Sequence, residues 1–328
     1  MLEELRKIRF ARFHLELEAV DRLRLPPYKG STFRGAFGNT FKRLVCVKRD
    51  LECATCLIQR QCVYYYVFET PYQGEPARGY TFVPHPFVIE PPEETREVYE
   101  PGEELRVGLV LVGKALDYLA YFIYAFEEMG RRGLGQGRGK AALRRVWAGE
   151  RLIYTAGEGR LDTDYPVCAG PHVVPAQEDS VSLCLQTPTR LKNGGRLSGD
   201  LDFPLLVRSL LRRASDLARF HCGAELGVDY RDWIDRAGRV RTAESYLRWH
   251  DWERYSHRQG AKMQMGGVVG EVSFAGELGP FLPLLSLGAD LHVGKGTGFG
   301  LGRYEMRTPP PAPPREQGGG AEKSSANG

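Results

Sequence analysis

The sequence contains no run of 18 consecutive apolar residues, so we expect no segment that spans a membrane and no membrane partner. The first residues, Met-Leu-Glu-Glu-Leu-Arg-Lys, are charged and lack the apolar core of a secretory signal peptide. The cysteines number seven, an odd count that, without a secretion signal, indicates reduced thiols. We therefore expect a cytoplasmic protein.

Charge of one sign is not in large excess, because the formal net charge is only +4. The distribution is more informative. Basic residues gather at 29–43, 131–145, 190–196 and 208–213, whereas acidic residues gather at 90–104. Separated basic segments of this kind favour a polyanionic partner. With 328 residues and 42% hydrophobic content, the chain is long enough for two cores of about 150 residues each.

A glycine-rich segment near the C-terminus is the most informative motif. Residues 294–303 read Gly-Lys-Gly-Thr-Gly-Phe-Gly-Leu-Gly-Arg. Glycine tolerates positive φ and close approach to a ligand, and a run of exposed N–H groups beside cations can cradle phosphate oxygens. The spacing matches neither a Walker loop nor a dinucleotide fingerprint, so nucleic acid is the first polyanion to consider. The expected RNA contacts in this loop are Gly294, Lys295, Gly296, Gly298 and Gly300.

A second copy of this motif predicts a duplicated unit. Residues 130–139 read Gly-Arg-Arg-Gly-Leu-Gly-Gln-Gly-Arg-Gly, about 165 residues earlier. Each copy follows an apolar, helix-like stretch and precedes a strand-like one. That repeat distance suits two domains of ordinary size.

The first half of the chain predicts the element order β-α-β-β-α-β, which is the ferredoxin-like pattern. Strands are expected at 6–20, 63–69, 80–90 and 104–112, and a helix from Lys114. Ser31 is expected to cap the other helix. The expected buried residues are Ile8, Phe10, Phe13, Leu15 and Leu17 on the first strand and Phe33, Phe37, Phe41 and Leu44 on the first helix.

The second half repeats the pattern. Strands are expected at 181–186, 241–255, 263–274 and 304–307, with a helix at 203–220 and another that holds Pro280 and Pro283 in its first turn. The expected fold class is α+β, as tandem ferredoxin-like (RRM-like) domains with a cysteine-cluster insertion. The expected boundaries are 1–156, a linker at 157–178, 179–308, and a disordered tail at 309–328.

Four cysteines follow the first helix closely. Cys46, Cys53, Cys56 and Cys62 have the spacing C-x6-C-x2-C-x5-C, which favours a bound metal over buried free thiols. Four thiolates suit zinc or an iron–sulfur cluster, and the spacing leaves both open. Because such a set leaves no open coordination position, the metal would be structural. Catalysis would then depend on side chains.

Candidate catalytic and binding residues surround the glycine-rich segment and the first helix. His292 adjoins the loop and has the chemistry of a general base or acid, although it could instead bond a backbone group and shape the loop. The role of His85 is left open. Gly30, Gly35 and Gly38 would let another backbone approach the first helix. Further RNA-contact candidates are Lys29, Arg34, Arg190, Lys192 and Arg258.

The combination of motifs resembles the Cas6 family of CRISPR-associated RAMP endoribonucleases. The motifs are Gly30-Ser-Thr-Phe-Arg-Gly-Ala-Phe-Gly38, Thr187-Pro-Thr-Arg-Leu-Lys192, Asp251-Trp-x-Arg-Tyr-Ser-x-Arg-Gln259, Gly266-Gly-Val-Val-Gly270 and the glycine-rich segment. The resemblance implies metal-independent cleavage within CRISPR repeats by 2′-hydroxyl attack, leaving a 2′,3′-cyclic phosphate or a 3′-phosphate. The implied partners are repeat RNA in precursor crRNA and other CRISPR effector subunits.

One departure from the family concerns the catalytic residue. Many relatives carry a histidine in or near the first helix, and none occurs here between His14 and His85. Tyr28, Lys29 and Lys42 are the alternatives that the resemblance leaves, beside His292. A non-cleaving RAMP subunit that binds crRNA is the main rival function, and a metal-organised scaffold for proteins is a third.

Overall fold

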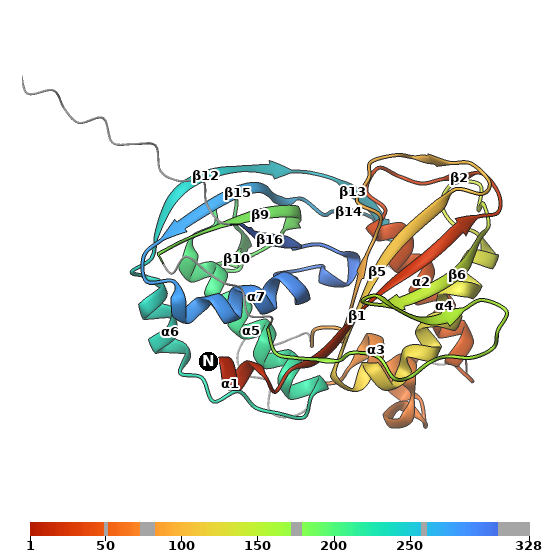
Figure 1. Ribbon diagram of the computed structural model, residues 1–328, viewed down its shortest axis with the longest axis horizontal. Coiled ribbons are helices and arrows are strands. Elements are labelled where there is room, and N and C mark those ends of the chain that lie inside the picture. The colour runs from red at the N-terminus through yellow and green to blue at the C-terminus, as the bar shows by residue number, and fades with distance from the viewer. Residues whose placement is uncertain (49–51, 73–82, 172–178, 257–260, 308–328) are drawn as a thin grey trace, which may run out of the picture.

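The computed structural model describes residues 1–48, 52–72, 83–171, 179–256 and 261–307. Two α+β domains follow one another along the chain, and each has the order β-α-β-β-α-β (Figure 1). The expected tandem ferredoxin-like fold is therefore confirmed. The expected tail lies outside the described residues.

The N-terminal domain is an antiparallel sheet with helices on one face. Its strands β1 (Arg9–Ala19), β3 (Phe87–Glu90), β5 (Glu104–Val112), β6 (Ala141–Ala148) and β7 (Arg151–Thr155) have the order β3-β5-β1-β6-β7. β8 (Cys168–Ala169) also pairs with β1 and falls within the stretch expected to be a linker. The helices are α2 (Gly30–Val45) and α4 (Leu119–Arg132). Short elements complete the domain: α1 (Leu2–Leu5), β2 (Leu23–Arg24), η1 (Cys53–Thr55), η2 (Gln59–Gln61), α3 (Val63–Glu69), β4 (Val98–Tyr99) and η3 (Gly113–Tyr118).

Alternation along β1 explains how the domain forms its core. Phe13, Leu15 and Leu17 project from one face of the strand and have at most 1% of their surface exposed. They pack against α2 and α4, where Phe37 stacks on Phe122 with ring centroids 5.3 Å apart. All five residues expected on the buried side of this strand are buried, although Ile8 and Phe10 join the core of the other domain.

The C-terminal domain repeats the arrangement. Strands β9 (Ser180–Thr189), β12 (Arg241–His250), β15 (Gly267–Ala275) and β16 (Tyr304–Arg307) form a sheet of order β12-β15-β9-β16. Helices α5 (Phe203–His221) and α7 (Leu282–Leu291) lie beneath it in Figure 1. As expected, prolines occupy the first turns of η4 (Gly279–Phe281) and α7. The remaining elements are β10 (Lys192–Asn193), β11 (Arg196–Leu197), α6 (Tyr230–Ala237), β13 (Glu253–Ser256), β14 (Ala261–Gln264) and η5 (Thr297–Phe299).

One expected strand is a helix. Residues 63–69 read Val-Tyr-Tyr-Tyr-Val-Phe-Glu, a composition typical of strands, but they form α3. In the helix, Tyr64 stacks on Phe68 one turn later, with centroids 4.8 Å apart, and Phe68 packs on Phe41 of α2. Packing against α2 therefore overrides the local β preference.

Two details of the first helix also differ from expectation. Ser31 is not the cap, because α2 begins at Gly30 with Lys29 in the capping position and no side-chain cap bond. Leu44 is 46% exposed, whereas Phe33, Phe37 and Phe41 are fully buried. The apolar stripe thus ends one turn before the helix does. None of the helices in the described parts of the chain is long and apolar enough to cross a membrane.

Candidate functional site

The glycine-rich loop at 294–302 connects α7 to β16 and is held by the end of β9. The Thr187 hydroxyl donates to the carbonyl of Gly300 at 2.8 Å, and the Gly302 N–H donates to the carbonyl of Pro188 at 3.2 Å. The Lys295 N–H donates to the carbonyl of Arg190 at 3.0 Å. These bonds fix the backbone of the loop on its own domain.

The same loop reaches the first turn of α2 in the other domain. The Tyr28 hydroxyl donates to the carbonyl of Phe299 at 2.6 Å. A Cβ placed on Gly30 would lie 2.2 Å from that carbonyl oxygen, so only glycine fits there. The expectation that glycines in the first helix allow a second backbone to approach is met at Gly30. It is not met at Gly35, where a Cβ would meet nothing within 4 Å.

Arg34 and His85 lie beside the tip of the loop. An Arg34 N–H donates to Nε2 of His85, with 3.2 Å between Nη2 and Nε2. A Cβ on Gly298 would lie 3.4 Å from Cδ2 of His85 and 3.5 Å from Nε of Arg34. The guanidinium also lies 5.5 Å from the ring centroid of Phe299. A cation, an imidazole and a glycine-rich backbone therefore meet at one point between the domains.

The protonation state of His85 follows from this environment. Burial, and then the positive charge of Arg34, lowers the pKa of His85 well below its ordinary value. The ring is therefore neutral at neutral pH and can accept a proton. Sequence reasoning left His85 without a role, because only its flanking prolines distinguished it. In the structure, residues 83–86 lead directly into β3, and His85 thereby lies beside Arg34 of α2.

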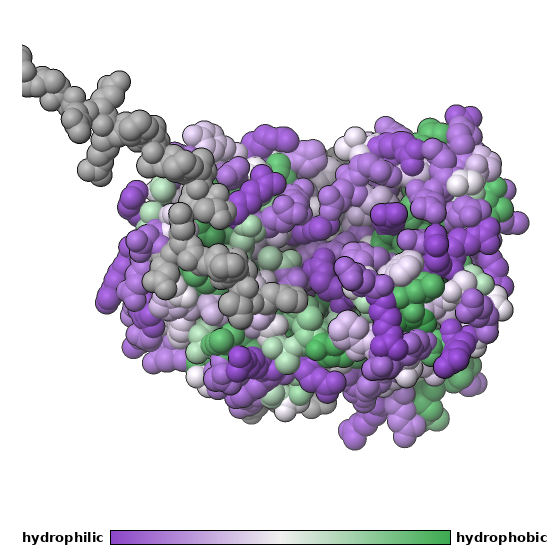
Figure 2. Space-filling model, viewed as in Figure 1, coloured by the Kyte–Doolittle hydropathy of each residue, from purple (hydrophilic) through white to green (hydrophobic). Residues whose placement is uncertain are grey.

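A group of basic side chains stands at the base of the loop. Lys295 is exposed, but partial burial of its side chain lowers its pKa. The charges of Lys192, Arg190 and Arg212 lower this pKa further. These three cations therefore lie close enough to Lys295 to disfavour its charge, and an anion bound among them would offset that repulsion. The face shown in Figure 2 is largely hydrophilic over both domains. The structure thus brings Arg190, Lys192 and Lys295 together.

His292 is enclosed between the domains. It has no exposed surface, its Nδ1 lies 3.1 Å from the carbonyl oxygen of Leu301, and its Nε2 lies 2.9 Å from Oε1 of Glu90. Its φ of 62° is rare for a residue with a side chain. Both ring nitrogens are thus engaged by groups that set the shape of the loop, which favours the loop-shaping alternative over catalysis.

The other candidates around the first helix do not converge on the loop. Lys42 lies near the far end of α2, about 18 Å along the helix axis from Gly30 at 1.5 Å per residue, with its ammonium 5.3 Å from the ring centroid of Tyr64. Lys29 has no exposed surface, and its ammonium donates to the carbonyls of Glu94 and Pro27. Burial lowers its pKa. The expectation that Lys29 contacts RNA is therefore corrected, and Arg258 lies outside the described residues.

The four cysteines of the insertion share one small pocket. The four cysteines all line it, together with residues that follow α2 and with Tyr64 and Tyr65 of α3. All four are free thiols of intermediate exposure, and burial raises the pKa of Cys53. In the residues that the structure describes, no three His, Cys, Asp or Glu side chains already stand in a metal-binding arrangement. The pocket therefore fits a metal only if the thiols move closer together.

Family models match both halves of the chain. Residues 183–304 match the family described as CRISPR-associated endoribonuclease Cas6, and residues 7–165 match a family described only as an N-terminal domain. An uncharacterized protein of Archaeoglobus fulgidus is 24% identical over 303 residues, covering 87% of this chain and 93% of that protein.

Solved structures share the fold. A Cas6 product complex aligns with a TM-score of 0.54 at 19% identity, covering 91% of this chain and 100% of the other. Thermus thermophilus Cas6 aligns with a TM-score of 0.51 at 16% identity, covering 92% and 99%. A Cas6-RT-Cas1–Cas2 complex aligns with a TM-score of 0.54 at 13% identity, covering 92% of this chain and 29% of that one. At these identities the alignments show a common fold.

Proposed function

Because the chain belongs to the Cas6 family of CRISPR-associated endoribonucleases, we propose that it cleaves precursor crRNA within the repeat. The observation that carries the proposal is the position of Arg34 and His85 at the tip of the glycine-rich loop. A phosphate at this point would meet a guanidinium and a neutral imidazole beside a backbone without a side chain at Gly298. These are the groups that a phosphodiester cleavage by general acid–base chemistry requires.

In the proposed reaction, the bound phosphate pairs with the Arg34 guanidinium and so frees Nε2 of His85, which takes the proton of the ribose 2′-hydroxyl. The 2′-oxygen attacks the adjacent phosphorus, a 2′-O–P bond forms, and the P–O5′ bond breaks. The departing O5′ takes a proton from solvent, which leaves a 2′,3′-cyclic phosphate and a 5′-hydroxyl. The Arg34 guanidinium offsets the negative charge that grows on the phosphate oxygens. All of these steps use the RNA, solvent and side chains of this chain.

RNA binding would itself prepare His85 for this role. The charge of Arg34 is the second cause of the low pKa of His85. A bound phosphate pairs with the guanidinium and so cancels part of that effect, which moves the pKa of His85 back towards neutral pH. A general base is most effective when its pKa is near the working pH.

The test is single-turnover cleavage of cognate repeat RNA in EDTA by the wild type and by His85→Ala. The variant should cleave about 10²- to 10⁴-fold more slowly while retaining its affinity for the repeat. His14→Ala is the matched control, because it removes an exposed imidazole on β1 whose charged neighbours are Arg12, Glu90, Arg303 and Arg106 and do not include Arg34. Wild-type rates in His85→Ala would rule out this histidine as the base.

The rival function is a non-cleaving RAMP subunit that binds crRNA. It predicts tight binding of intact repeat by the wild type and no product over hours. That result would refute the endoribonuclease proposal. The basic group of Arg190, Lys192 and Lys295 would then bind RNA without cleavage.

We further propose that Cys46, Cys53, Cys56 and Cys62 hold one zinc ion or one iron–sulfur cluster. Their spacing and their shared pocket support this proposal. The group would supply a cross-link between the end of α2 and the start of α3. The thiols would lose their protons on binding, so metal content and folding would be coupled.

A further inference from the structure

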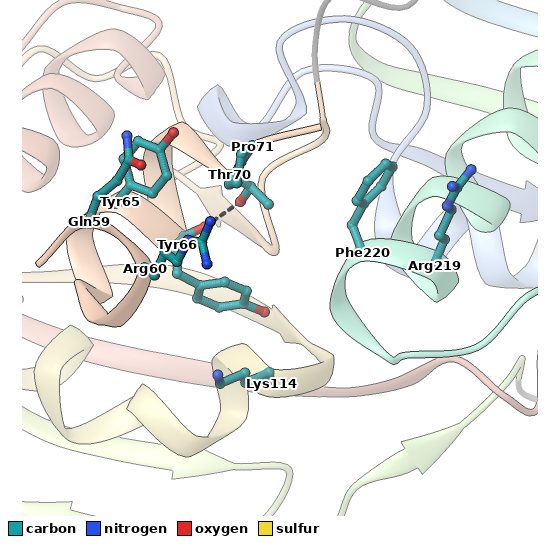
Figure 3. A pocket seen from close by; sticks show the side chains of 9 residues that line it. All are labelled: Gln59, Arg60, Tyr65, Tyr66, Thr70, Pro71, Lys114, Arg219 and Phe220. Carbon is teal, nitrogen blue, oxygen red and sulfur yellow. Dashed lines mark hydrogen bonds between the residues drawn. The ribbon is translucent and has the colours of Figure 1, made fainter. Parts of the chain in front are cut away.

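A larger cavity opens between the two domains, on the side of α3 and the C-terminal end of α5. Its volume is about 710 Å³, within the usual range for sites that hold organic ligands. Figure 3 shows that Arg60, Tyr65 and Tyr66 reach it from the N-terminal domain, together with Lys114, whereas Arg219 and Phe220 come from α5. Both domains are needed to form it.

The charge of the cavity is positive. Arg60, Lys114 and Arg219 are exposed, and the described residues that line the cavity include no carboxylate. Arg219 forms a long ion pair with Glu225, at 4.0 Å, and the Glu225 side chain is 83% exposed. A pair of this kind in water holds little energy, so a phosphate group competes well for the guanidinium.

The cations stand over aromatic rings. The Lys114 ammonium lies 5.6 Å from the ring centroid of Tyr66, and the Arg219 guanidinium lies 5.5 Å from that of Phe220. Aromatic faces beside cations are the usual platform for unpaired bases, which stack on the ring while the cation pairs with the backbone. The cavity therefore has both elements of a single-strand nucleotide site.

Two hydrogen bonds join this cavity to Pro84, the residue before His85. The Tyr66 hydroxyl lies 3.1 Å from Nδ1 of His221, and Nε2 of His221 lies 2.7 Å from the carbonyl oxygen of Pro84. Since the carbonyl only accepts, Nε2 carries the proton and Nδ1 accepts from Tyr66. Pro84 directly precedes His85, so the wall of the cavity and the proposed cleavage point are adjacent parts of one structure.

We propose that this cavity binds one or two unpaired nucleotides of the RNA, next to the segment held at the glycine-rich loop. The inference rests on the proposed function, because it assigns a flank of the same substrate. Phosphates pair with Arg60, Lys114 and Arg219, and a base stacks on Phe220.

The test measures the affinity of the protein for three RNAs. The first is repeat RNA with both single-stranded flanks, and the other two are trimmed at the 5′ side or at the 3′ side. Arg219→Ala and Phe220→Leu should each weaken binding of the full RNA about tenfold. One of the two trimmed RNAs should bind the wild type as weakly as the full RNA binds the variants. Neither substitution should weaken the binding of that trimmed RNA further. Arg231→Ala on α6 removes an equal charge away from the cavity and should bind the full RNA like the wild type.

The outcomes separate this inference from the cleavage proposal. Affinity is measured without turnover, so a protein that binds but never cuts still tests the cavity. Equal losses by Arg219→Ala on full and on both trimmed RNAs would overturn the inference, as would wild-type affinity of both variants for the full RNA. Melting temperatures near that of the wild type would show that the variants remain folded.

Discussion

His292 and Glu90 are 202 positions apart in the sequence, yet Nε2 of the histidine lies 2.9 Å from Oε1 of the carboxylate. Arg12 of β1 donates to both oxygens of the same carboxylate, at 2.8 and 3.0 Å. Glu90 ends β3, and His292 directly follows α7, two residues before the glycine-rich loop. This contact therefore anchors a loop of the second domain to the sheet of the first.

Stability should depend on the ionisation of Glu90. Burial alone would raise the pKa of Glu90, but the hydrogen bond and charge of His292, and then the charge of Arg12, lower it to about 2. The ordinary value is 4.5, so this contribution is complete above pH 4.5 and is lost as the pH falls from 4.5 towards 2. Glu90→Gln should cost about 3–5 kcal/mol of stability at pH 7 and progressively less at acidic pH.

Thermal unfolding of wild type and Glu90→Gln between pH 2 and pH 7 measures this effect. Glu97→Gln, at an exposed glutamate, is the control and should change little at any pH. His292→Ala combined with Glu90→Gln should cost less than the sum of the single changes, because the two side chains share one interaction. Additive losses would mean that the contact does not contribute.

The approach of the loop to α2 should depend on Gly30. In Gly30→Ala the new Cβ would overlap the carbonyl oxygen of Phe299, so the loop must move and cleavage should fall at least tenfold. Gly35→Ala is the matched control within the same helix. It meets open space and should raise stability by about 0.5–1 kcal/mol without loss of cleavage. Equal behaviour of the two variants would argue against the docked position of the loop.

The basic group at the base of the loop should govern the salt dependence of RNA binding. Lys295→Ala should weaken binding of all RNA sequences alike and reduce the slope of log affinity against log salt concentration by about one unit. Arg231→Ala on α6 removes the same charge and should leave the slope unchanged. Titrations at several salt concentrations measure both slopes, and an unchanged slope in Lys295→Ala would exclude a phosphate contact.

The cysteine pocket predicts one zinc ion or one cluster per chain in freshly purified, reduced protein. Cys53→Ser should lower the metal content and the melting temperature together, since binding and folding are coupled. Cys168→Ser, at a cysteine in β8 outside the pocket, should change neither. Elemental analysis that finds neither zinc nor iron in the wild type would refute the proposal.

Much of the fold was predictable because its signals are local. Alternation over residues 9–19 and helical spacing over 203–221 identify β1 and α5, and the duplicated glycine motif indicates two similar units. Prediction failed at 63–69, where a β-prone segment forms α3 because Val67 and Phe68 are buried beside α2. Sequence pattern describes one segment at a time, and such burial depends on a second segment.

The candidate site shows the same division. The sequence alone identified the glycine-rich loop, the basic segments and the four cysteines, because residue type and spacing carry their chemistry. Only the tertiary structure decided that Lys29 is buried, that Lys42 lies at the wrong end of α2, and that His85 stands beside Arg34. Burial and contacts between distant segments set the pKa and the reach of a side chain, and they exist only once the two domains have packed together.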